Sequence, residues 1–408
     1  MAKRPRRFPA DRRAVFRSGV SLKRRIYPWR SGNHFELLID GPQFFPRMRA
    51  SIEQAVERID FELYLLEAGG CAEQLVGALE AAVARGVRVR CLFDGFGSRG
   101  LGAVRLQGLR DAGIELRLYN PMSWRHGVFN LYRDHRKLLL VDGREGYVGG
   151  AGLTDEFWTP DAEVSDWHEV MVWMSGPVLS DWQHLFERQW QACERRAPWR
   201  ASEQEPIPAA LLPPLPRSGA GWGRVAYADA DQHRDILLSL ARALHGGKQR
   251  IWFATPYFLP TWRIRRVLRR AAKRGVDVRL LTAGPHTDNA PVRFAGQRYY
   301  SKLLRAGVRI YEYQPRFLHL KMVLIDDWLS VGSCNFDHWN LRFNLDANLE
   351  ALDAGLSDAA ETCFEADFAQ SREITRADWK ARPFRQRVQQ RLWGLCNQLV
   401  IDLFNRRR

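Results

Sequence analysis

The pattern His-x-Lys-x-x-x-x-Asp occurs twice in this chain, and its six residues are His135, Lys137, Asp142, His319, Lys321 and Asp326. On a β-strand, side chains two positions apart share a face, so each histidine is expected to point the same way as its lysine. Each aspartate falls where its strand ends, and we expect it to fix the turn there. A single copy would usually be an exposed polar face, but two copies with equal spacing predict a catalytic site.

Two imidazoles and two ammonium groups form a set that suits the chemistry of phosphodiesters. A neutral histidine can attack phosphorus and form a phosphohistidine, while a protonated histidine donates to the leaving oxygen. The second histidine then acts as base for an incoming alcohol or water, and the lysines neutralise the non-bridging oxygens. This mechanism needs no metal and no other cofactor. The residues alone do not say which histidine attacks.

A turn of small residues follows each motif, with the sequence GGAGLTD after the first and GSCNFD after the second. Such turns bring backbone N–H groups and short polar side chains close to a bound anion. We therefore predict that Ser333 and Asn335, from the second turn, bind phosphate. The first turn offers Gly152 where the second offers Asn335, so the two halves are not equivalent.

The elements around the two motifs follow one order, which is repeated. Predicted helices over 45–59 and 72–86 alternate with predicted strands over 60–68, 87–95, 114–120 and 135–143. The second half repeats this order with helices over 233–249, 264–275 and 299–307 and strands over 250–259, 276–284, 308–315 and 319–327. AAVARGVRVRCL in the first half also matches AAKRGVDVRLL in the second, which indicates a duplication. The sequence therefore predicts an α/β fold of two similar sandwich halves that share one site.

Composition divides the chain into five segments. A stretch rich in Pro, Ser and Gly has no clear period and is typical of a linker between the halves. The predicted segments are a basic N-terminal segment over 1–28, a first repeat over 29–194, a linker over 195–223, a second repeat over 224–380 and a basic amphipathic helix over 381–408.

The chain is strongly basic, with 62 Lys and Arg against 46 Asp and Glu among 408 residues, a net charge of +16. Such a surface attracts polyanions, either nucleic acid or the anionic face of a membrane. No stretch approaches the about 18 apolar residues of a spanning helix, and the N-terminus lacks the apolar core of a secretory signal. We therefore expect a protein that is soluble or lies on a membrane surface. The six cysteines show no Cys-x-x-Cys spacing, which indicates reduced thiols.

Two segments are candidates for contact with lipid. The C-terminal segment has apolar residues at helical spacing between arginines, at Val388, Leu392, Leu395, Leu399 and Leu403. It predicts a basic helix that either lies on an anionic bilayer or packs on the protein core with its arginines facing lipid. The loop before the first motif either admits a lipid headgroup or simply packs. Its residues are Trp124, His126, Phe129 and Tyr132.

Around these motifs the chain resembles the phospholipase D superfamily, and within it the bacterial cardiolipin synthases of the shorter, peripheral type without N-terminal membrane helices. The resemblance runs from about Trp29 to the C-terminal segment, apart from the linker, and includes YPWRSGNHFELLIDGPQFFPRM and GPHTDNAPVRFAGQRYYSKLLRAGVRIYEY. It implies two halves with mixed sheets, related by a pseudo-twofold, with the active site between them. It also implies that the first motif supplies the nucleophile, which assigns attack to His135 and the acid and base roles to His319.

The resemblance implies a phosphatidyltransferase that joins two phosphatidylglycerols and releases glycerol through a phosphohistidine. The expected partner is an anionic phosphatidylglycerol membrane, and the expected location is the cytoplasmic face of a bacterial inner membrane, bound peripherally. The alternative is a phosphodiesterase that hydrolyses phospholipid or nucleic acid with the same residues, and the resemblance favours lipid. The oligomeric state stays open.

In this family a carboxylate downstream of each motif holds the catalytic histidine by its second ring nitrogen. The resemblance places these carboxylates at Glu169, with Asp166 as second choice, and at Asp346, with Glu350 in reserve. A carboxylate of this kind fixes the tautomer and stabilises the imidazolium. Three positions depart from the Asn, Arg and Glu that are usual in the family, namely Gly152, Trp339 and Asp346.

Overall fold

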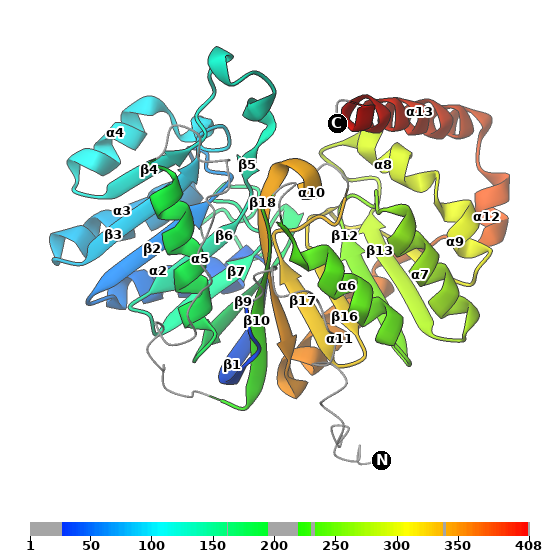
Figure 1. Ribbon diagram of the computed structural model, residues 1–408, viewed down its shortest axis with the longest axis horizontal. Helices are drawn as coiled ribbons and strands as arrows, with labels where there is room; N and C mark the ends of the chain where they lie inside the picture. Colours follow the sequence, from blue (N-terminus) through cyan, green and yellow to red (C-terminus); the bar gives the residue numbers. More distant parts are fainter. Residues whose placement is uncertain (1–26, 161, 195–218, 230–232, 338–339, 407–408) are drawn as a thin grey trace.

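The computed structural model describes residues 27–160, 162–194, 219–229, 233–337 and 340–406, which form two similar halves (Figure 1). Residues 1–26 of the predicted basic segment, residues 195–218 of the predicted linker and Trp339 lie outside the described residues. Tyr27 is already part of the buried core, so the first half includes it.

The first half is built on one mixed sheet, with strands in the order β1, β9, β7, β6, β2, β3, β4. Only the pairs β2–β3 and β3–β4 are parallel. The strands are β1 (Arg30–Ile39), β2 (Arg58–Leu63), β3 (Arg88–Asp94), β4 (Glu115–Tyr119), β6 (Lys137–Val141), β7 (Glu145–Gly149) and β9 (Val170–Ser175). The helices are α2 (Gly41–Gln54), α3 (Gly70–Ala84), α4 (Ala103–Asp111) and α5 (Leu179–Ala192).

The second half repeats this sheet in the order β10, β18, β17, β16, β12, β13, β14, with β19 added at the edge. Only β12–β13 and β13–β14 are parallel. The strands are β10 (Gly221–Asp229), β12 (Arg250–Thr255), β13 (Asp277–Ala283), β14 (Arg309–Tyr313), β16 (Met322–Ile325), β17 (Trp328–Gly332), β18 (Asn344–Leu352) and β19 (Ser371–Glu373). The helices are α6 (Asp235–Gly246), α7 (Trp262–Lys273), α8 (Ala290–Gln297), α9 (Tyr300–Leu304), α10 (Asn340–Phe343), α11 (Ala354–Ala369), α12 (Arg376–Ala381) and α13 (Phe384–Arg406).

The two sheets have the same order and the same pattern of parallel and antiparallel neighbours, strand for strand. This confirms the predicted α/β fold with two mixed-sheet halves. The sheets join where the start of β1 pairs with the start of β10, at Arg30 opposite Gly223. Because β10 begins at Gly221, the last residues assigned to the linker already belong to the second sheet.

Three clusters of buried side chains form the core. One lies between the halves and contains alternate residues of β9 and β18, such as Val172 and Leu349, together with residues of α5 and α11. The other two lie beneath α2 and α3 in the first half and beneath α6, α7 and α9 in the second. Met171, between two residues of the central cluster, belongs to the outer one, as the two-residue period of a strand requires.

Short strands tie each motif to the opposite half. β5 (Arg133–Asp134), directly before His135, pairs in parallel with the start of β18. β15 (Phe317–Leu318), directly before His319, pairs in parallel with β8 (Trp167–His168) of the first half. Each half therefore pairs a short strand with the other half, as a twofold relation between the halves requires.

The motif aspartates lie in turns at the far end of the motif strands, away from the lysines. Asp142 and Asp326 both have left-handed backbones, with φ of 52° and 50°. The Asp142 carboxylate accepts the backbone N–H groups of residues 56–58 at 2.8 to 3.0 Å, and Asp326 accepts those of residues 248–250 at 2.9 to 3.1 Å. These hydrogen bonds anchor the neighbouring strands, so both carboxylates fix the turns in which they lie.

Replacing Asp142 with alanine should lower the free energy of unfolding by about 2 kcal/mol, because three backbone N–H groups lose their acceptor. Asp142→Asn should cost less, since the amide keeps one acceptor and asparagine tolerates the left-handed region. Urea denaturation followed by circular dichroism measures both, with Glu53→Ala in an exposed ion pair as the control. A variant of normal stability without turnover would instead place Asp142 in catalysis.

Candidate active site

The His135 ring is held by a carboxylate of the opposite half. Its Nδ1 lies 2.9 Å from Oδ1 of Asp346, a fully buried residue of β18. The same oxygen accepts the hydroxyl of Ser333 at 2.7 Å, so Ser333 orients the carboxylate, whereas the sequence predicted a phosphate ligand there. The ring also meets Tyr64 edge-on, with centroids 4.9 Å apart. With Nδ1 engaged, Nε2 is the nitrogen left for substrate.

The His319 ring is held in the same way from the first half. Its Nδ1 lies 2.6 Å from Oε2 of Glu169, and the ammonium of Lys321 lies 3.1 Å from the same oxygen. The other Glu169 oxygen accepts the backbone N–H of Val170 at 2.9 Å. Three aromatic rings surround this imidazole at centroid distances of 5.1 to 5.7 Å, namely Phe157, Trp167 and Phe317.

This crossed pairing follows from the path of the short strands. The backbone N–H of His135 donates to the carbonyl of Leu345 at 2.9 Å, and the next residue of β18 carries the carboxylate that holds the ring. The backbone N–H of His319 donates to the carbonyl of His168 at 2.8 Å, and Glu169 comes next. Neither half therefore holds a complete imidazole–carboxylate pair by itself.

The glycines after each motif make room for the strands that carry the carboxylates. A Cβ on Gly150 would lie 2.2 Å from Oε2 of Glu169, and one on Gly332 would lie 2.3 Å from the carbonyl oxygen of Ala347. A Cβ on Gly152 would lie 2.9 Å from Cβ of Leu65, so no asparagine fits at this position without a shift. Close packing accounts for these glycines, in place of the anion cradle suggested by the sequence.

Burial lowers the pKa of both motif histidines, to about 4 for His135 and about 3 for His319. The lysine of the same motif lowers each pKa further, while the paired carboxylate opposes the shift. Each motif also acts on the other, because Lys321 lowers the pKa of His135 and Lys137 lowers that of His319. Both motifs therefore face one site, whose two imidazoles are neutral at pH 7 before substrate binds.

The two lysines repel each other in this buried site. Burial and the charge of Lys321 lower the pKa of Lys137 to about 7. Burial likewise lowers the pKa of Lys321, against the attraction of Glu169. Burial alone would raise the pKa of Glu169, but Lys321 and His319 outweigh it and bring this pKa to about 2. A bound anion would relieve the repulsion between the ammonium groups.

The structure thus brings both His–Lys pairs together with Glu169 and Asp346, but not the reserve carboxylates. Glu350 accepts Arg224 and Ser239 at 2.7 Å each, in a structural cluster. Asp166 lines a cleft whose described lining residues include neither motif histidine. Asn335 is buried, and its Oδ1 has no hydrogen-bond partner among the described residues, so its side chain stays a candidate for substrate.

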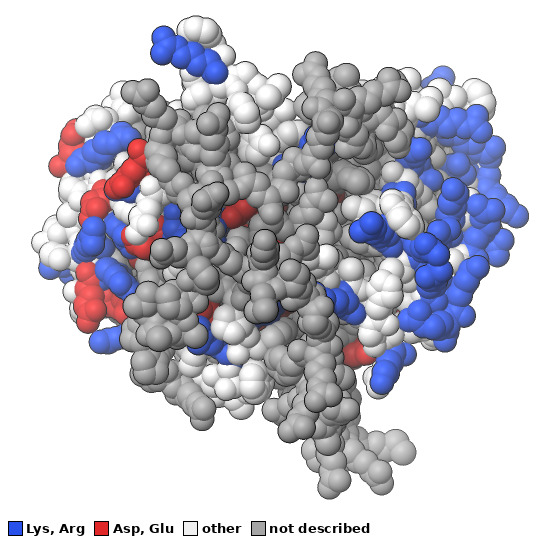
Figure 2. All heavy atoms as spheres, in the orientation of Figure 1, with Lys and Arg blue, Asp and Glu red and all other residues white. Residues whose placement is uncertain are grey.

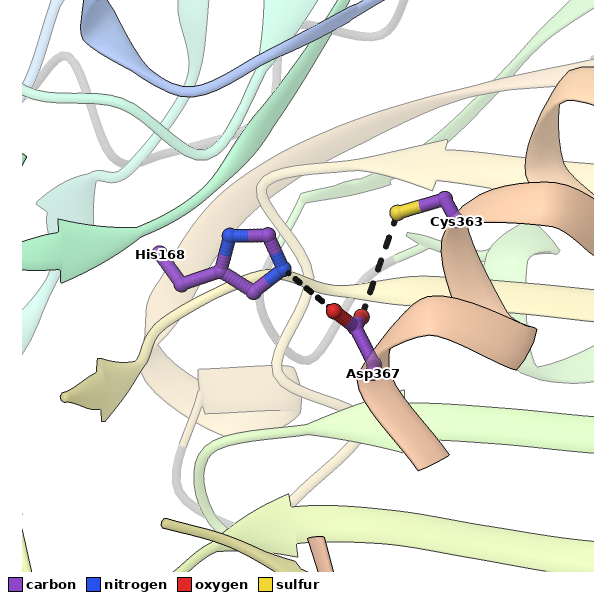
Figure 3. Close-up of side chains that lie close together, drawn as sticks. All are labelled: His168, Cys363 and Asp367. Carbon is purple, nitrogen blue, oxygen red and sulfur yellow. Dashed lines mark hydrogen bonds and ion pairs between the residues drawn. The ribbon is translucent and has the colours of Figure 1, made fainter. Parts of the chain in front are cut away.

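His168, a buried residue beside the site, was not predicted from the sequence. Its Nδ1 lies 2.8 Å from Asp40, and its Nε2 lies 3.0 Å from Asp367 on α11, toward which it points in Figure 3. Burial alone would lower the pKa of His168, but Asp367 and Asp40 outweigh it and hold this pKa well above its usual value. An imidazolium between two carboxylates therefore clamps β8 of the first half to the second half.

The same cluster offers the ligand types of a metal site. Atoms of His168, Asp367 and Cys363 lie within 4.8 Å of one another, and the Cys363 sulfur lies 3.9 Å from Asp367 (Figure 3). The proton on His168 already balances the charges of this cluster, because positive His168 and Arg316 face negative Asp40 and Asp367. The charges balance in this way, so we assign the cluster to positioning the strand that leads into the Glu169 carboxylate.

The loop before the first motif forms a one-sided protrusion, η2 (Trp124–Leu131), which rises above the first half in Figure 1. Trp124, its first residue, is 85% exposed. At its base, the ring of Tyr132 contacts Phe129 and also Phe343 of the second half, at centroid distances of 5.9 and 5.8 Å. The base of the loop therefore packs, while Trp124 presents an apolar ring to the surroundings.

Comparison with known families decides the class of this site. Residues 48–190 and 240–368 match the family described as cardiolipin synthase, PLD-like domain. The chain belongs to this cardiolipin synthase family. It is 35% identical to cardiolipin synthase A of Pseudomonas putida (strain W619) over 356 residues, which are 86% of this chain and 72% of that protein. It is 33% identical to cardiolipin synthase A of Pseudomonas entomophila (strain L48), over 96% of this chain and 80% of that protein.

Solved structures support the fold of a cardiolipin synthase-type enzyme of the phospholipase D superfamily. The phosphatidylserine synthase of Haemophilus influenzae Rd KW20 matches with a TM-score of 0.69 and 11% identity, over 91% of this chain and 94% of that one. The polyphosphate kinase of Porphyromonas gingivalis matches with a TM-score of 0.57 and 14% identity, over 88% and 53%. At these identities the likeness concerns the fold alone. None of the described helices is long and apolar enough to cross a bilayer.

The pKa values of three histidines in this region should be shifted in opposite directions. His135 and His319 should stay neutral as the pH falls through about 6.5, the ordinary histidine pKa, whereas His168 should stay protonated above it. Below about pH 6.5 the two motif histidines bind protons in the unfolded chain but not in the folded protein. Both should therefore lower the free energy of unfolding as the pH falls through this range. Histidine-selective NMR, assigned with single His→Gln variants, measures the three pKa values. A motif histidine that titrates near 6.5 without substrate would contradict the buried pairing.

Proposed function

We propose that this protein transfers a phosphatidyl group from one phosphatidylglycerol to a hydroxyl of a second, forming cardiolipin and releasing glycerol. The observation that carries the proposal is the convergence of two carboxylate-held imidazoles and two buried lysines on one site, in a chain of the cardiolipin synthase family. Relatives named cardiolipin synthase A, similar over most of the chain, support a lipid as the substrate.

In the first half-reaction, Nε2 of His135 attacks the phosphorus of the donor lipid, and the bond from phosphorus to the glycerol oxygen breaks. His319 gives its Nε2 proton to that oxygen, so glycerol leaves as a neutral alcohol. Asp346 accepts the Nδ1–H of His135 and stabilises the positive charge that the ring gains with the P–N bond. Lys137 and Lys321 neutralise the non-bridging oxygens as the transition state forms.

In the second half-reaction, His319 takes the proton of the acceptor hydroxyl, and the hydroxyl oxygen attacks phosphorus. The P–N bond breaks, and its electron pair returns to a neutral His135. The acceptor glycerol then carries two phosphatidyl groups. Water in place of the acceptor would give phosphatidate, so the access of water to the phosphohistidine decides between transfer and hydrolysis.

Binding of the anionic substrate favours uptake of a proton from solvent by His319. With a pKa of about 3, this histidine is neutral at pH 7 in the empty site. A phosphodiester anion about 4 Å away stabilises the imidazolium by about 4 kcal/mol at an effective dielectric constant of about 20, which corresponds to about three pKa units. Occupation of the site by a phosphate group therefore raises the protonated fraction of His319, which supplies the general acid.

An anionic membrane surface is the partner that this reaction requires, because both substrates lie in a bilayer. The net charge of +16 and the exposed ring of Trp124 support a peripheral location on the cytoplasmic face. The same charge favours nucleic acid equally well as a polyanion. Hydrolysis of phospholipid or nucleic acid is therefore the second candidate activity, and both belong in the test.

Purified protein incubated with phosphatidylglycerol vesicles should produce cardiolipin and glycerol in equal amounts, because each transfer releases one glycerol. His135→Ala and His319→Ala should each lower turnover by about 10³-fold or more, while His245→Ala, in an exposed histidine, should leave it unchanged. EDTA should leave most activity, because imidazole and ammonium groups fill every role. Mass spectrometry identifies the lipids. Phosphatidate as the main product, or cleavage of single-stranded DNA with the lipid untouched, would overturn the proposed transfer.

The nucleophile can be identified by trapping with a phosphatidyl ester that carries a good leaving group. His319→Ala should accumulate a phosphohistidine at His135, because such a leaving group departs without an acid but the next step lacks its base. His135→Ala should accumulate none. Peptide mass spectrometry locates the modified residue. A phosphohistidine at His319 in the His135→Ala protein would reverse the two roles.

A further inference from the structure

A second candidate binding site lies away from the motifs, where α9, α12 and α13 enclose a groove of about 610 Å³. Five cationic side chains line it, and none of its described lining residues is acidic. The five are Arg298, Lys380, Arg382, Arg387 and Arg391. Such a concentration of like charge is unfavourable unless an anion occupies the groove.

Neutral groups hold the arginines in place without cancelling their charge. Arg298 donates to the carbonyl of Gly394 at 2.5 Å, and Arg387 donates to the carbonyl of Arg382 at 3.2 Å. Arg382 donates to the side-chain oxygen of buried Gln390 at 2.9 Å. The guanidinium groups are thereby fixed in direction but remain uncompensated, which is the arrangement of a preformed anion site.

A buried aromatic ring supports one of the groove's arginines. Trp379 lines the groove and is only 7% exposed. The Arg382 guanidinium stacks over this ring, 4.1 Å from its centroid. The cation–π contact holds this guanidinium beside the groove without neutralising its charge.

The helix that forms one wall also carries an apolar stripe on its surface. Phe384, Val388 and Leu392 follow one another at helical spacing on α13 and are 45 to 77% exposed, and Leu395 is 62% exposed. The helix contacts α8 and leaves these side chains largely exposed. An apolar stripe beside a cationic groove matches the interface of a bilayer that contains anionic phospholipid.

The position of the groove agrees with this partner. Figure 1 shows α13 and the η2 protrusion at the same edge of the molecule, one over each half. Figure 2 shows mixed charges over the first half but mostly Lys and Arg along the outer side of the second half. A bilayer against this edge would meet the η2 protrusion at one side and α13 at the other.

We propose that the groove between α9, α12 and α13 is a second, non-catalytic site for the phosphate headgroup of an anionic phospholipid, with the α13 stripe inserted among the neighbouring acyl chains. It extends the membrane partner of the proposed function but requires no turnover. Its occupation would hold the enzyme on its substrate surface while the motif site releases one lipid product and takes up the next substrate.

Sedimentation with mixed phosphatidylcholine–phosphatidylglycerol vesicles tests the site. The double variant Lys380→Gln with Arg391→Gln, at exposed residues of the groove, should bind these vesicles roughly 10- to 30-fold more weakly. The matched control, Lys273→Gln with Arg270→Gln on exposed positions of α7, removes the same charge outside the groove and should lose much less. Equal losses in both variants, or no loss in either, would overturn the headgroup site.

A second pair of measurements separates a lipid headgroup from free phosphate. Leu392→Ser, at an exposed position, should weaken vesicle binding but leave the melting temperature unchanged. Inorganic phosphate, compared with chloride at equal ionic strength, should displace the protein from vesicles only weakly, because it lacks acyl chains. Full displacement by phosphate, together with normal vesicle binding by Leu392→Ser, would make the groove a free-phosphate site and overturn the proposal. Failure of this binding would leave the test of cardiolipin formation unaffected, since sedimentation requires no turnover.

Discussion

The hydrogen bond from each motif imidazole to a carboxylate of the opposite half is the interaction on which the rest of the structure depends. Glu169 and Asp346 are both buried in the folded protein, and a buried charge that loses its partner is strongly destabilising. The two halves therefore complete each other: β5 pairs with β18, β15 pairs with β8, and one central cluster of apolar side chains fills the space between the sheets. The duplicated chain forms one site because each copy lacks one member of the pair.

Adjacent residues at the interface between the halves carry opposite charges. His168 and Glu169 are neighbours in sequence, yet their charged partners, acting against burial, keep one positive and the other negative. His168 and Arg316 together balance Asp40 and Asp367, so that side of the strand is neutral. On the other side, two lysines balance two carboxylates while both imidazoles stay neutral. A bound phosphate group adds negative charge, which the two ammonium groups and protonation of one imidazole can balance.

Local patterns were sufficient to predict the repeated elements, both motifs and the α/β class, because strand and helix periods and the motif spacing are written in contiguous residues. The crossed pairing could not be predicted, since it depends on β5 and β15, two-residue strands too short to leave a period. The hydrogen bond from Ser333 to Asp346 could not be predicted either, because a short polar residue in a glycine turn has the same sequence pattern whether it faces a phosphate or a buried carboxylate. A lone histidine at the end of a strand, such as His168, carries no signal until its distant partners are known.

The asymmetry between the two pairs supports different roles for two histidines that the motif makes equal. The Lys321 ammonium and the His319 ring contact the same oxygen of Glu169, so this carboxylate is shared between two groups. Asp346 receives only His135 and the neutral hydroxyl of Ser333, while Lys137 donates to a backbone carbonyl. Asp346 can therefore better stabilise a ring that carries a phosphoryl group and a positive charge. Because His319 shares its carboxylate with Lys321, its imidazolium is less stabilised, which suits the group that must release its proton to glycerol.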